Sequence, residues 1–300
     1  MSSAIDRLIL GSNPLYGVDH YSAERARTRL ASIDAAQVSA IMKCAFEAGA
    51  QGFNFSPHPL IYDAFRILKA EGFAGEFGLY PMIPDTRRYI TAQLTKGSLG
   101  ALKETLSQLS PGTGAKAVLQ GGLSLLALNP YKLMNLYLEV EVKAILRVVP
   151  RRAVLRTVLA HEVMTDMILA LNASEWMTKY CQSVRTRFKV KPGFVTRNFP
   201  RFVQFCEECD ISLSDIVIMT PVNPIGFQMT PDRVTCEETF ARISGANVIA
   251  MSILAAGQVD LQRAVDYVAK LPNLDSVAVG VSTTSHAKET FAILTRELLR

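Results

Sequence analysis

The sequence predicts a (β/α)8 barrel, and three features support this prediction. Short apolar runs of the β type alternate along the chain with amphipathic stretches, which is the pattern of parallel strands joined by crossover helices. Eight such runs are present, and each contains few charged residues, as expected for strands that are buried on both faces. The chain has 300 residues, which matches the length of a barrel of eight units. A doubly wound open sheet is the alternative arrangement.

The predicted elements follow one another through the chain. Strands are expected near Leu8–Leu10, Gly52–Phe55, Phe77–Tyr80, Val154–Ala160, Gly193–Thr196, Ile216–Met219, Val248–Met251 and Val277–Val279. Helices are expected at Asp34–Ala48, Leu60–Ala70, Phe202–Glu208, Cys236–Ile243, Leu261–Leu271 and Ala287–Leu299. Several helices end at a glycine, which is typical of a helix C-terminus.

The third crossover is longer than the others, and we predict a helical insertion there at about residues 86–152. Helical periodicity is present in Leu99–Leu109 and again in Tyr131–Leu146. The run Ala117–Gln120 fits either a strand or a helix, because short apolar runs are ambiguous. No proline- or serine-rich hinge divides the chain, so we expect one domain over residues 1–300.

Composition excludes several classes of protein. The longest apolar stretches, such as Leu123–Leu128 and Val248–Ala256, are too short to span a membrane. Lysine and arginine total 32 against 27 aspartate and glutamate, and this net charge of +5 is scattered, so nucleic acid is not an expected partner. Five cysteines are too few for a disulfide scaffold, and the first residues do not resemble a secretion signal. We expect a cytoplasmic protein that binds a small molecule.

Polar residues follow most of the predicted strands. In a (β/α)8 barrel the active site lies at the C-terminal ends of the strands, so these residues are expected to surround it. Asn13, Asn198 and Asn223 occupy such positions, and we predict that they bind the substrate. The alternative is that these residues only form turns.

His161 is the main catalytic candidate, because it directly follows an apolar strand and imidazole exchanges protons near neutral pH. Its alternative role is a hydrogen bond to the loop backbone. Asn54 and His58 follow the second strand, and we predict that they belong to the same catalytic group.

The last predicted loop favours an anion. Gly280 is followed by the hydroxyl residues Ser282, Thr283 and Thr284, shortly before the helix expected at Ala287. Hydroxyl groups and helix N-terminal N–H groups bind phosphate or the anionic part of a cofactor. The alternative is an ordinary helix cap at Ser285.

A metal-dependent hydrolase is a second hypothesis for the barrel mouth. His58, His161 and Asp85 are the candidate ligands, and together they form the mixed nitrogen and oxygen set that divalent metals accept. No HxH or HExxH spacing is present, so the sequence commits to no metal.

Several segments resemble the landmarks of aldo-keto reductases in their order and spacing. They are LILGSNPLYG (Leu8–Gly17), AFEAGAQGFNFS (Ala45–Ser56), VLAH (Val158–His161), GFVTRN (Gly193–Asn198), NVIAMSILAAG (Asn247–Gly257) and SVAVGVSTTSH (Ser276–His286). The resemblance implies a (β/α)8 barrel that uses NADPH and an Asp, Tyr, Lys and His tetrad.

The tetrad is mostly missing from the positions that the resemblance assigns to it. Its aspartate falls on Asn54 and its tyrosine near Pro59, and the third strand FGLYPMIP has no lysine. Only His161 matches, and the aromatic residue that stacks on nicotinamide falls on Met251. We therefore predict that NADPH does not bind at micromolar concentration.

The sequence thus predicts an enzyme that uses acid–base chemistry on a small carbonyl- or phosphate-bearing metabolite. It is not expected to be a standard NADPH aldo-keto reductase. The alternatives are a metal-dependent hydrolase, an NADPH reductase with an altered tetrad, and a barrel that binds a ligand without catalysis.

Overall fold

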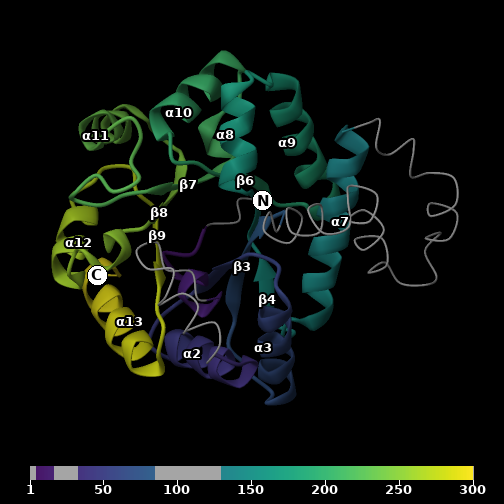
Figure 1. The fold of residues 1–300 in the computed structure, drawn as a ribbon, viewed down its shortest axis with the longest axis vertical. Coiled ribbons are helices and arrows are strands. Elements are labelled where there is room, and N and C mark those ends of the chain that lie inside the picture. Colours follow the sequence, from purple (N-terminus) through teal and green to yellow (C-terminus); the bar gives the residue numbers. More distant parts are fainter. Residues whose placement is uncertain (1–4, 17–32, 85–129, 300) are drawn as a thin grey trace, which may run out of the picture.

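The computed structural model describes residues 5–16, 33–84 and 130–299, which form a closed barrel of parallel strands inside a ring of helices (Figure 1). Around the barrel the strands are β2 (Gly52–Phe55), β1 (Leu8–Gly11), β9 (Ser276–Gly280), β8 (Asn247–Met251), β7 (Val217–Pro221), β6 (Lys191–Val195), β5 (Thr157–Ala160), β3 (Phe77–Ile83) and β4 (Ala153–Leu155). Pairing of β2 with β3 closes the sheet. The predicted (β/α)8 barrel is confirmed, and the open sheet is excluded.

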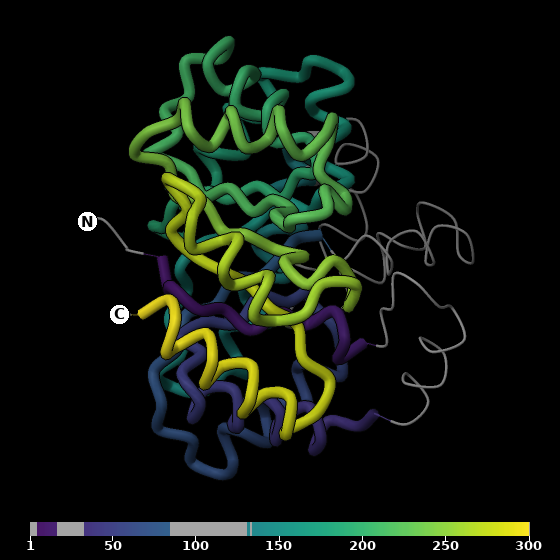
Figure 2. Tube along the Cα trace, turned by 90° about the vertical axis from the view of Figure 1, so that its left-hand side faces the viewer, coloured from purple at the N-terminus to yellow at the C-terminus, as the bar shows by residue number. Residues whose placement is uncertain are grey.

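Helices cover the outside of the barrel. They are α2 (Ala35–Glu47), α3 (Pro59–Ala70), α7 (Pro130–Val148), α8 (Glu162–Ala170), α9 (Ser174–Phe188), α10 (Phe199–Glu208), α11 (Arg233–Arg242), α12 (Leu261–Val268) and α13 (Thr284–Leu298), with the short 3-10 turns η1 (Asn13–Tyr16), η3 (Leu213–Asp215) and η4 (Ala255–Gly257). Figure 2 shows that the start of β1 and the end of α13 lie at the same end of the barrel. We call this end the floor and the opposite end the mouth. None of the helices in the described ranges has the length and apolar character that crossing a membrane requires.

The fourth place in the barrel is shared by β4 and β5, where the sequence predicted one strand, Val154–Ala160. β4 pairs with β3 from Phe77 to Leu79, and β5 pairs with it at Met82 and Ile83. The register slips by one residue between the two segments, as in a β-bulge. One predicted strand therefore appears as two, and the number of places in the barrel stays at eight.

Three helices begin three residues earlier than the sequence analysis predicted. The starts of α10, α11 and α13 lie three residues before the predicted Phe202, Cys236 and Ala287. In each case a side chain caps the first turn: Asn198, Asp232 and Thr283 accept hydrogen bonds from backbone N–H groups. The caps satisfy N–H groups that lack partners within the helix, so the helix begins directly after them.

Two helices, α8 and α9, were missed in the fourth crossover. In the predicted insertion, α7 confirms the helical periodicity of Tyr131–Leu146. The helix expected at Leu99–Leu109 and the ambiguous run Ala117–Gln120 lie outside the described residues. The described strands close the barrel among themselves.

The floor of the barrel holds a polar network around Asp6. The Tyr80 hydroxyl donates to Asp6 Oδ2 at 2.9 Å and accepts from the Asp6 backbone N–H at 2.6 Å. Arg156 Nη2 lies 3.2 Å from Asp6 Oδ1. Two glycines make room for this network. A Cβ atom on Gly52 would lie 2.7 Å from Tyr80 Cε2, and a Cβ atom on Gly78 would overlap Asp6 Oδ2.

The floor network predicts a pH dependence of stability. Burial raises the pKa of Asp6, and this outweighs the Tyr80 hydroxyl and the Arg156 guanidinium, which lower it. A raised pKa means that the folded state holds this proton more tightly than the unfolded state does. The contribution of Asp6 to stability is therefore complete below the ordinary aspartate pKa and is lost as the pH rises through the raised value.

The variant Asp6→Asn cannot titrate at this position. We expect the free energy of unfolding of the wild type, relative to Asp6→Asn, to rise as the pH falls from about 7 to about 4. Urea denaturation of both proteins across that range measures the difference. A difference that stays constant, or falls toward acid pH, contradicts the assignment.

Candidate functional site

Side-chain alternation along the strands identifies the residues that face the mouth. An apolar cluster inside the barrel is formed by Ile9, Tyr80, Leu159, Val195, Val217, Met219, Ile249 and Ala278. Successive strand residues point to opposite faces, so the residue two places further on also faces inward. Continued to the ends of the strands and, for β5 and β6, just beyond them, this alternation assigns to the mouth Gly11, Asn54, Met82, His161, Arg197, Pro221, Met251 and Gly280. We call them the mouth layer.

His161 belongs to the mouth layer and also caps α8. The sheet hydrogen-bond pattern continues to this residue, because its N–H donates to Ile83 O at 3.0 Å. His161 Nδ1 accepts from the Val163 N–H at 3.2 Å. A neutral imidazole whose Nδ1 is an acceptor carries its proton on Nε2, so the cap sets the tautomer. His161 thus holds an N–H donor at the rim of the barrel.

His58 repeats this arrangement at the end of β2. Its Nδ1 accepts from the Leu60 N–H at 3.2 Å and caps α3. The Tyr16 ring lies against the imidazole with 5.2 Å between ring centroids. The Tyr16 hydroxyl donates to Ser56 O at 2.7 Å, which ties η1 to this loop. Both candidate catalytic histidines therefore act as helix caps whose second nitrogen carries the proton.

Asn54 lies in the wall of the mouth and is almost fully buried, with 8% of its surface exposed. Its Nδ2 donates to Tyr80 O at 2.9 Å on the neighbouring strand. This bond fixes which prong of the amide is nitrogen and which is oxygen. Oδ1 accepts no hydrogen bond from the described part of the chain.

Two charged contacts join the loops that follow β5 and β6. Arg197 forms a two-pronged ion pair with Glu162, with Nη2–Oε1 at 2.6 Å and Nε–Oε2 at 3.1 Å. Asp166 Oδ1 accepts from the Thr196 hydroxyl at 2.8 Å. Burial raises the pKa of Asp166, although the hydrogen bond from Thr196 lowers it. The two contacts hold Arg197 beside His161 at the rim.

Thr196 is fully buried and connects three segments. Its hydroxyl donates to Asp166 and accepts from the Asn198 N–H at 3.1 Å. Thr196→Val keeps the shape of the side chain but removes both hydrogen bonds. We expect it to lower the free energy of unfolding by about 1–3 kcal/mol, because two groups lose their partners. Chemical denaturation of Thr196→Val, beside the exposed control Thr186→Val on α9, measures this, and equal effects of the two changes contradict it.

The three asparagines predicted to bind substrate have different surroundings. Asn13 is exposed at the start of η1. Asn198 Oδ1 accepts from the Arg201 N–H at 3.3 Å and caps α10. Asn223 is fully buried. Its Oδ1 accepts from the Phe227 N–H at 2.8 Å, and its Nδ2 donates to Phe227 O at 2.8 Å and to Ser252 O at 3.3 Å. Asn223 organises the loop after β7, and its predicted contact with substrate stays a prediction.

The predicted anion loop lies after β9. Thr283 caps α13 by accepting from the His286 N–H at 3.1 Å, so the cap is Thr283 and not Ser285. Ser282 is half-buried, and Thr283 and Thr284 are exposed. The helix N-terminus at this loop is the feature that favours an anion. Gly280 has a packing role, since a Cβ atom there would lie 2.6 Å from Pro14 Cδ.

The metal hypothesis gains no support from the part of the chain that the structure describes. Within it, no group of three or more histidine, cysteine, aspartate or glutamate side chains is arranged to hold a metal ion. His58 and His161 each use Nδ1 as a helix cap. The third candidate ligand, Asp85, lies outside the described residues.

The residues present at the mouth do not fit NADPH as an aldo-keto reductase would hold it. The inward position near the end of β3 is occupied by Met82, which packs against the apolar interior cluster. Met251 packs against the same cluster and supplies no aromatic surface. Pro14 lies over Gly280 at the end of β9. Among the described residues, the positions at the ends of β3 and β8 thus hold methionine in place of the charged and aromatic groups that the resemblance implies.

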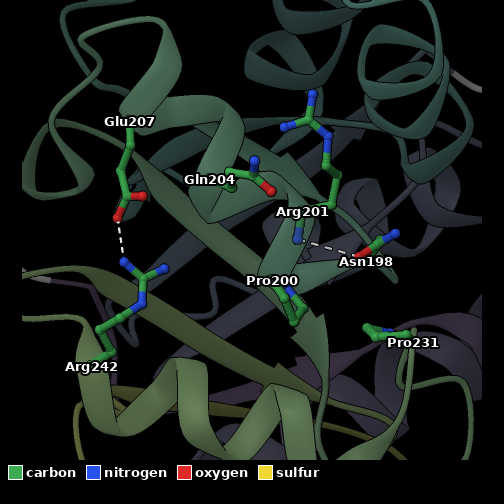
Figure 3. Close-up of a pocket in the computed structure, with 7 residues that line it drawn as sticks. All are labelled: Asn198, Pro200, Arg201, Gln204, Glu207, Pro231 and Arg242. Atoms are coloured by element: carbon green, nitrogen blue, oxygen red, sulfur yellow. Dashed lines mark hydrogen bonds and ion pairs between the residues drawn. The ribbon is translucent and has the colours of Figure 1, made fainter.

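A hollow of about 540 Å³ lies on the outer surface between α10 and α11 (Figure 3). It is lined by Asn198, Pro200, Arg201, Gln204, Glu207, Pro231 and Arg242. Its two arginines already have partners: Arg242 pairs with Glu207 at 2.6 Å, and Arg201 pairs with Glu208 at 3.0 Å. The charges of the hollow are compensated within the protein, so it shows no preference for a charged ligand.

The fold resembles that of known aldo-keto reductase structures. A candidate aldo-keto reductase from Pseudomonas aeruginosa superposes with a TM-score of 0.57 and 14% identity, over 98% of this chain and 92% of that chain. A candidate 2,5-diketo-D-gluconic acid reductase B superposes with a TM-score of 0.51 and 14% identity, over 97% and 83% of the two chains. No protein-family model matches the sequence, and comparison with curated proteins finds no match. At this identity the similarity establishes the fold and leaves the reaction open.

Sequence reasoning did not select Arg197, Glu162, Asp166 and Thr196 as a group. The signal was present in the alternation of β6, because an inward Val195 places Thr196 outward toward α8 and Arg197 inward. The ion pair also required α8 to begin at Glu162, and that helix was not predicted. Arg197 is therefore a charged residue of the mouth layer that the sequence analysis did not select.

Proposed function

We propose that this chain, whose barrel has the fold of aldo-keto reductases, is an enzyme that uses acid–base chemistry on a small carbonyl- or phosphate-bearing metabolite at the mouth layer. The observation that carries the proposal is the capped His161, whose Nδ1 accepts from Val163 while its proton stays on Nε2. An imidazole held neutral at a helix N-terminus can polarise a carbonyl through its Nε2–H.

His161 acts on the acid side of this chemistry. Its Nε2–H donates a hydrogen bond to the carbonyl or phosphoryl oxygen on which negative charge develops. Nδ1 accepts from the Val163 N–H, so the proton that the imidazole donates is the one on Nε2. His58 supplies a second donor of the same kind, one strand away across β3.

Arg197 and the α13 N-terminus favour an anionic part on the metabolite. Arg197 donates one Nε and one Nη2 proton to Glu162, and Nη1 forms no hydrogen bond or ion pair with a described residue. Ser282, Thr283 and Thr284 lie by the N-terminus of α13. In an eight-stranded barrel β9 lies opposite β5, so an anion at this loop and a carbonyl at His161 would span the mouth.

Isotope exchange tests the proposal without knowledge of the substrate. The wild type is incubated in D2O with a panel of small aldehydes, ketones and phosphate esters, and mass spectrometry follows deuterium incorporation and phosphate release. We expect at least one compound to react only when protein is present. A panel in which none reacts, although some compounds bind, supports a ligand-binding barrel without catalysis.

Calorimetric titration with NADPH separates this proposal from the reductase alternative. We expect no binding at micromolar concentration, because Met82 and Met251 replace the charged and aromatic groups that the cofactor needs. Tight binding of NADPH, together with carbonyl reduction, would replace the proposal by a reductase with an altered tetrad.

A further inference from the structure

Four cationic side chains lie in one corner of the barrel floor, where α3 and α7 end and β4 begins. They are Lys69, Arg147, Arg151 and Arg152, and each is exposed. Lys69 Nζ donates to Arg147 O at 3.1 Å, which ties the end of α3 to the end of α7. Arg152 Nη1 donates to Ala74 O at 3.1 Å, in the loop after α3. The fold thus gathers charges from distant parts of the sequence, and we call these four residues the basic corner.

No carboxylate neutralises the basic corner. None of its four side chains forms an ion pair with a described residue. The carboxylates nearby in the chain are paired with other cations. Glu71 lies 3.9 Å from Lys43 Nζ. Asp6 and Glu76 lie 3.2 Å and 3.8 Å from Arg156. The corner therefore keeps its four positive charges for a partner outside the described chain.

Helix capping explains only part of this arrangement. Cations stabilise helix C-termini, and Lys69 contacts such a terminus through Arg147 O. Arg147 and Arg151 donate no side-chain hydrogen bond within the described ranges. Each guanidinium therefore keeps all of its N–H donors, in the fork geometry that binds phosphate through two parallel hydrogen bonds.

Two exposed apolar side chains adjoin the basic corner. Leu146 precedes Arg147 and is 46% exposed. Val154 is 37% exposed and lies two residues after Arg152, so the two side chains share one face of the chain where β4 begins. Cations beside exposed aliphatic groups favour an anionic lipid surface, because headgroups attract the cations and apolar groups enter the boundary with the acyl chains.

Single-stranded nucleic acid fits the basic corner less well. Proteins bind it by stacking bases on aromatic side chains beside a basic groove. The exposed large apolar side chains in the described ranges are all aliphatic, and those at this corner are Leu146 and Val154. The corner thus offers charge and aliphatic surface without a stacking platform.

We infer that the basic corner docks this protein on an anionic phospholipid surface, with the four cations against the headgroups and Leu146 and Val154 in the interfacial layer. The contact is peripheral and reversible, because it depends on a few charges and two small apolar groups. The mouth lies at the opposite end of the barrel, so docking by the floor leaves the candidate site open to solution. This inference does not depend on the reaction at the mouth.

Vesicle sedimentation tests the inference with the wild-type protein. Vesicles of phosphatidylcholine alone are compared with vesicles that also contain about one-third phosphatidylserine. We expect binding to the anionic vesicles only, and weaker binding at high salt, because salt screens the attraction. Equal binding to the two kinds of vesicle, or binding to neither, would overturn the inference.

The double variant Arg147→Gln, Arg151→Gln assigns the binding to the basic corner. Each cation near an anionic surface contributes about fivefold in affinity, so we expect a loss of about thirtyfold. The control Arg263→Gln, Lys288→Gln removes two exposed cations near the starts of α12 and α13, at the mouth end, and is expected to change affinity by less than about threefold. Equal losses in the two variants would mean that net charge, and not this corner, determines the binding.

The variant Leu146→Ser distinguishes a lipid surface from another polyanion. We expect it to lower affinity for the anionic vesicles by about threefold to tenfold, because an apolar group no longer leaves water. The control Ile225→Ser changes a side chain of similar exposure, 43%, after β7 and is expected to have no effect. Polyglutamate and polyuridylate serve as soluble probes. Binding of either as tight as that of the vesicles, together with no effect of Leu146→Ser, would assign the corner to an acidic protein or to RNA and overturn the lipid proposal.

Discussion

Gly78→Ala is expected to lower the free energy of unfolding by about 2–4 kcal/mol, because overpacking here also breaks hydrogen bonds. The new Cβ atom would overlap Asp6 Oδ2 and would lie 2.7 Å from Arg156 Cγ and 2.9 Å from Tyr80 Cε2. Asp6 cannot move aside without losing its bonds to Tyr80 and Arg156. Urea denaturation of the variant and the wild type measures the loss.

A double variant tests the cause of this destabilisation. In Asp6→Ala the carboxylate is absent, so part of the clash at Gly78 is removed. We expect the double variant to lose less free energy of unfolding than the sum of the losses in the two single variants, Gly78→Ala and Asp6→Ala. If the two losses in free energy of unfolding add exactly, the clash with Asp6 does not explain the destabilisation by Gly78→Ala.

His161→Ser is expected to lower turnover of any substrate found in the exchange panel by about 100- to 1,000-fold, which is the usual effect of removing one donor to a developing oxyanion. The serine hydroxyl can still accept the Val163 N–H and cap α8, so we expect the fold to remain stable. His161→Ala removes the donor and the cap together, and it should cost about 1 kcal/mol of stability in addition.

The comparison of these variants separates catalysis from structure. His286 is exposed on α13, and His286→Ser is expected to leave turnover unchanged. If His161→Ser turns over substrate like the wild type while His161→Ala does not, the residue acts only as a helix cap.

The barrel could be predicted because its strands are short apolar runs at regular spacing, and this pattern can be recognised in the sequence without knowledge of tertiary contacts. The start of α12 at Leu261 was predicted correctly, but the starts of α10, α11 and α13 were not, since Asn198, Asp232 and Thr283 act as caps only when the chain turns there. The slip in register between β4 and β5 was also hidden, because it depends on pairing with β3.

The site was predictable only in part for a related reason. His161 follows an apolar strand, and that position alone placed it at the mouth. Asn223 also follows a strand, but its partners include Ser252 O on a different loop, and such long-range contacts leave no local signal. The Arg197–Glu162 pair depends on the start of α8, which capping by His161 defines.

The central claim is that His161 is a ligand-facing donor held in the Nε2–H form. Two-bond ¹⁵N–¹H correlation spectra of the histidine side chains report the tautomer directly, with His161→Ser used to assign the signals. We predict the Nε2–H tautomer in the free protein and a change in the His161 Nε2 shift when a compound active in the exchange panel is added. An Nδ1–H tautomer, or an Nε2 signal that does not respond to a compound that is being turned over, would contradict the account.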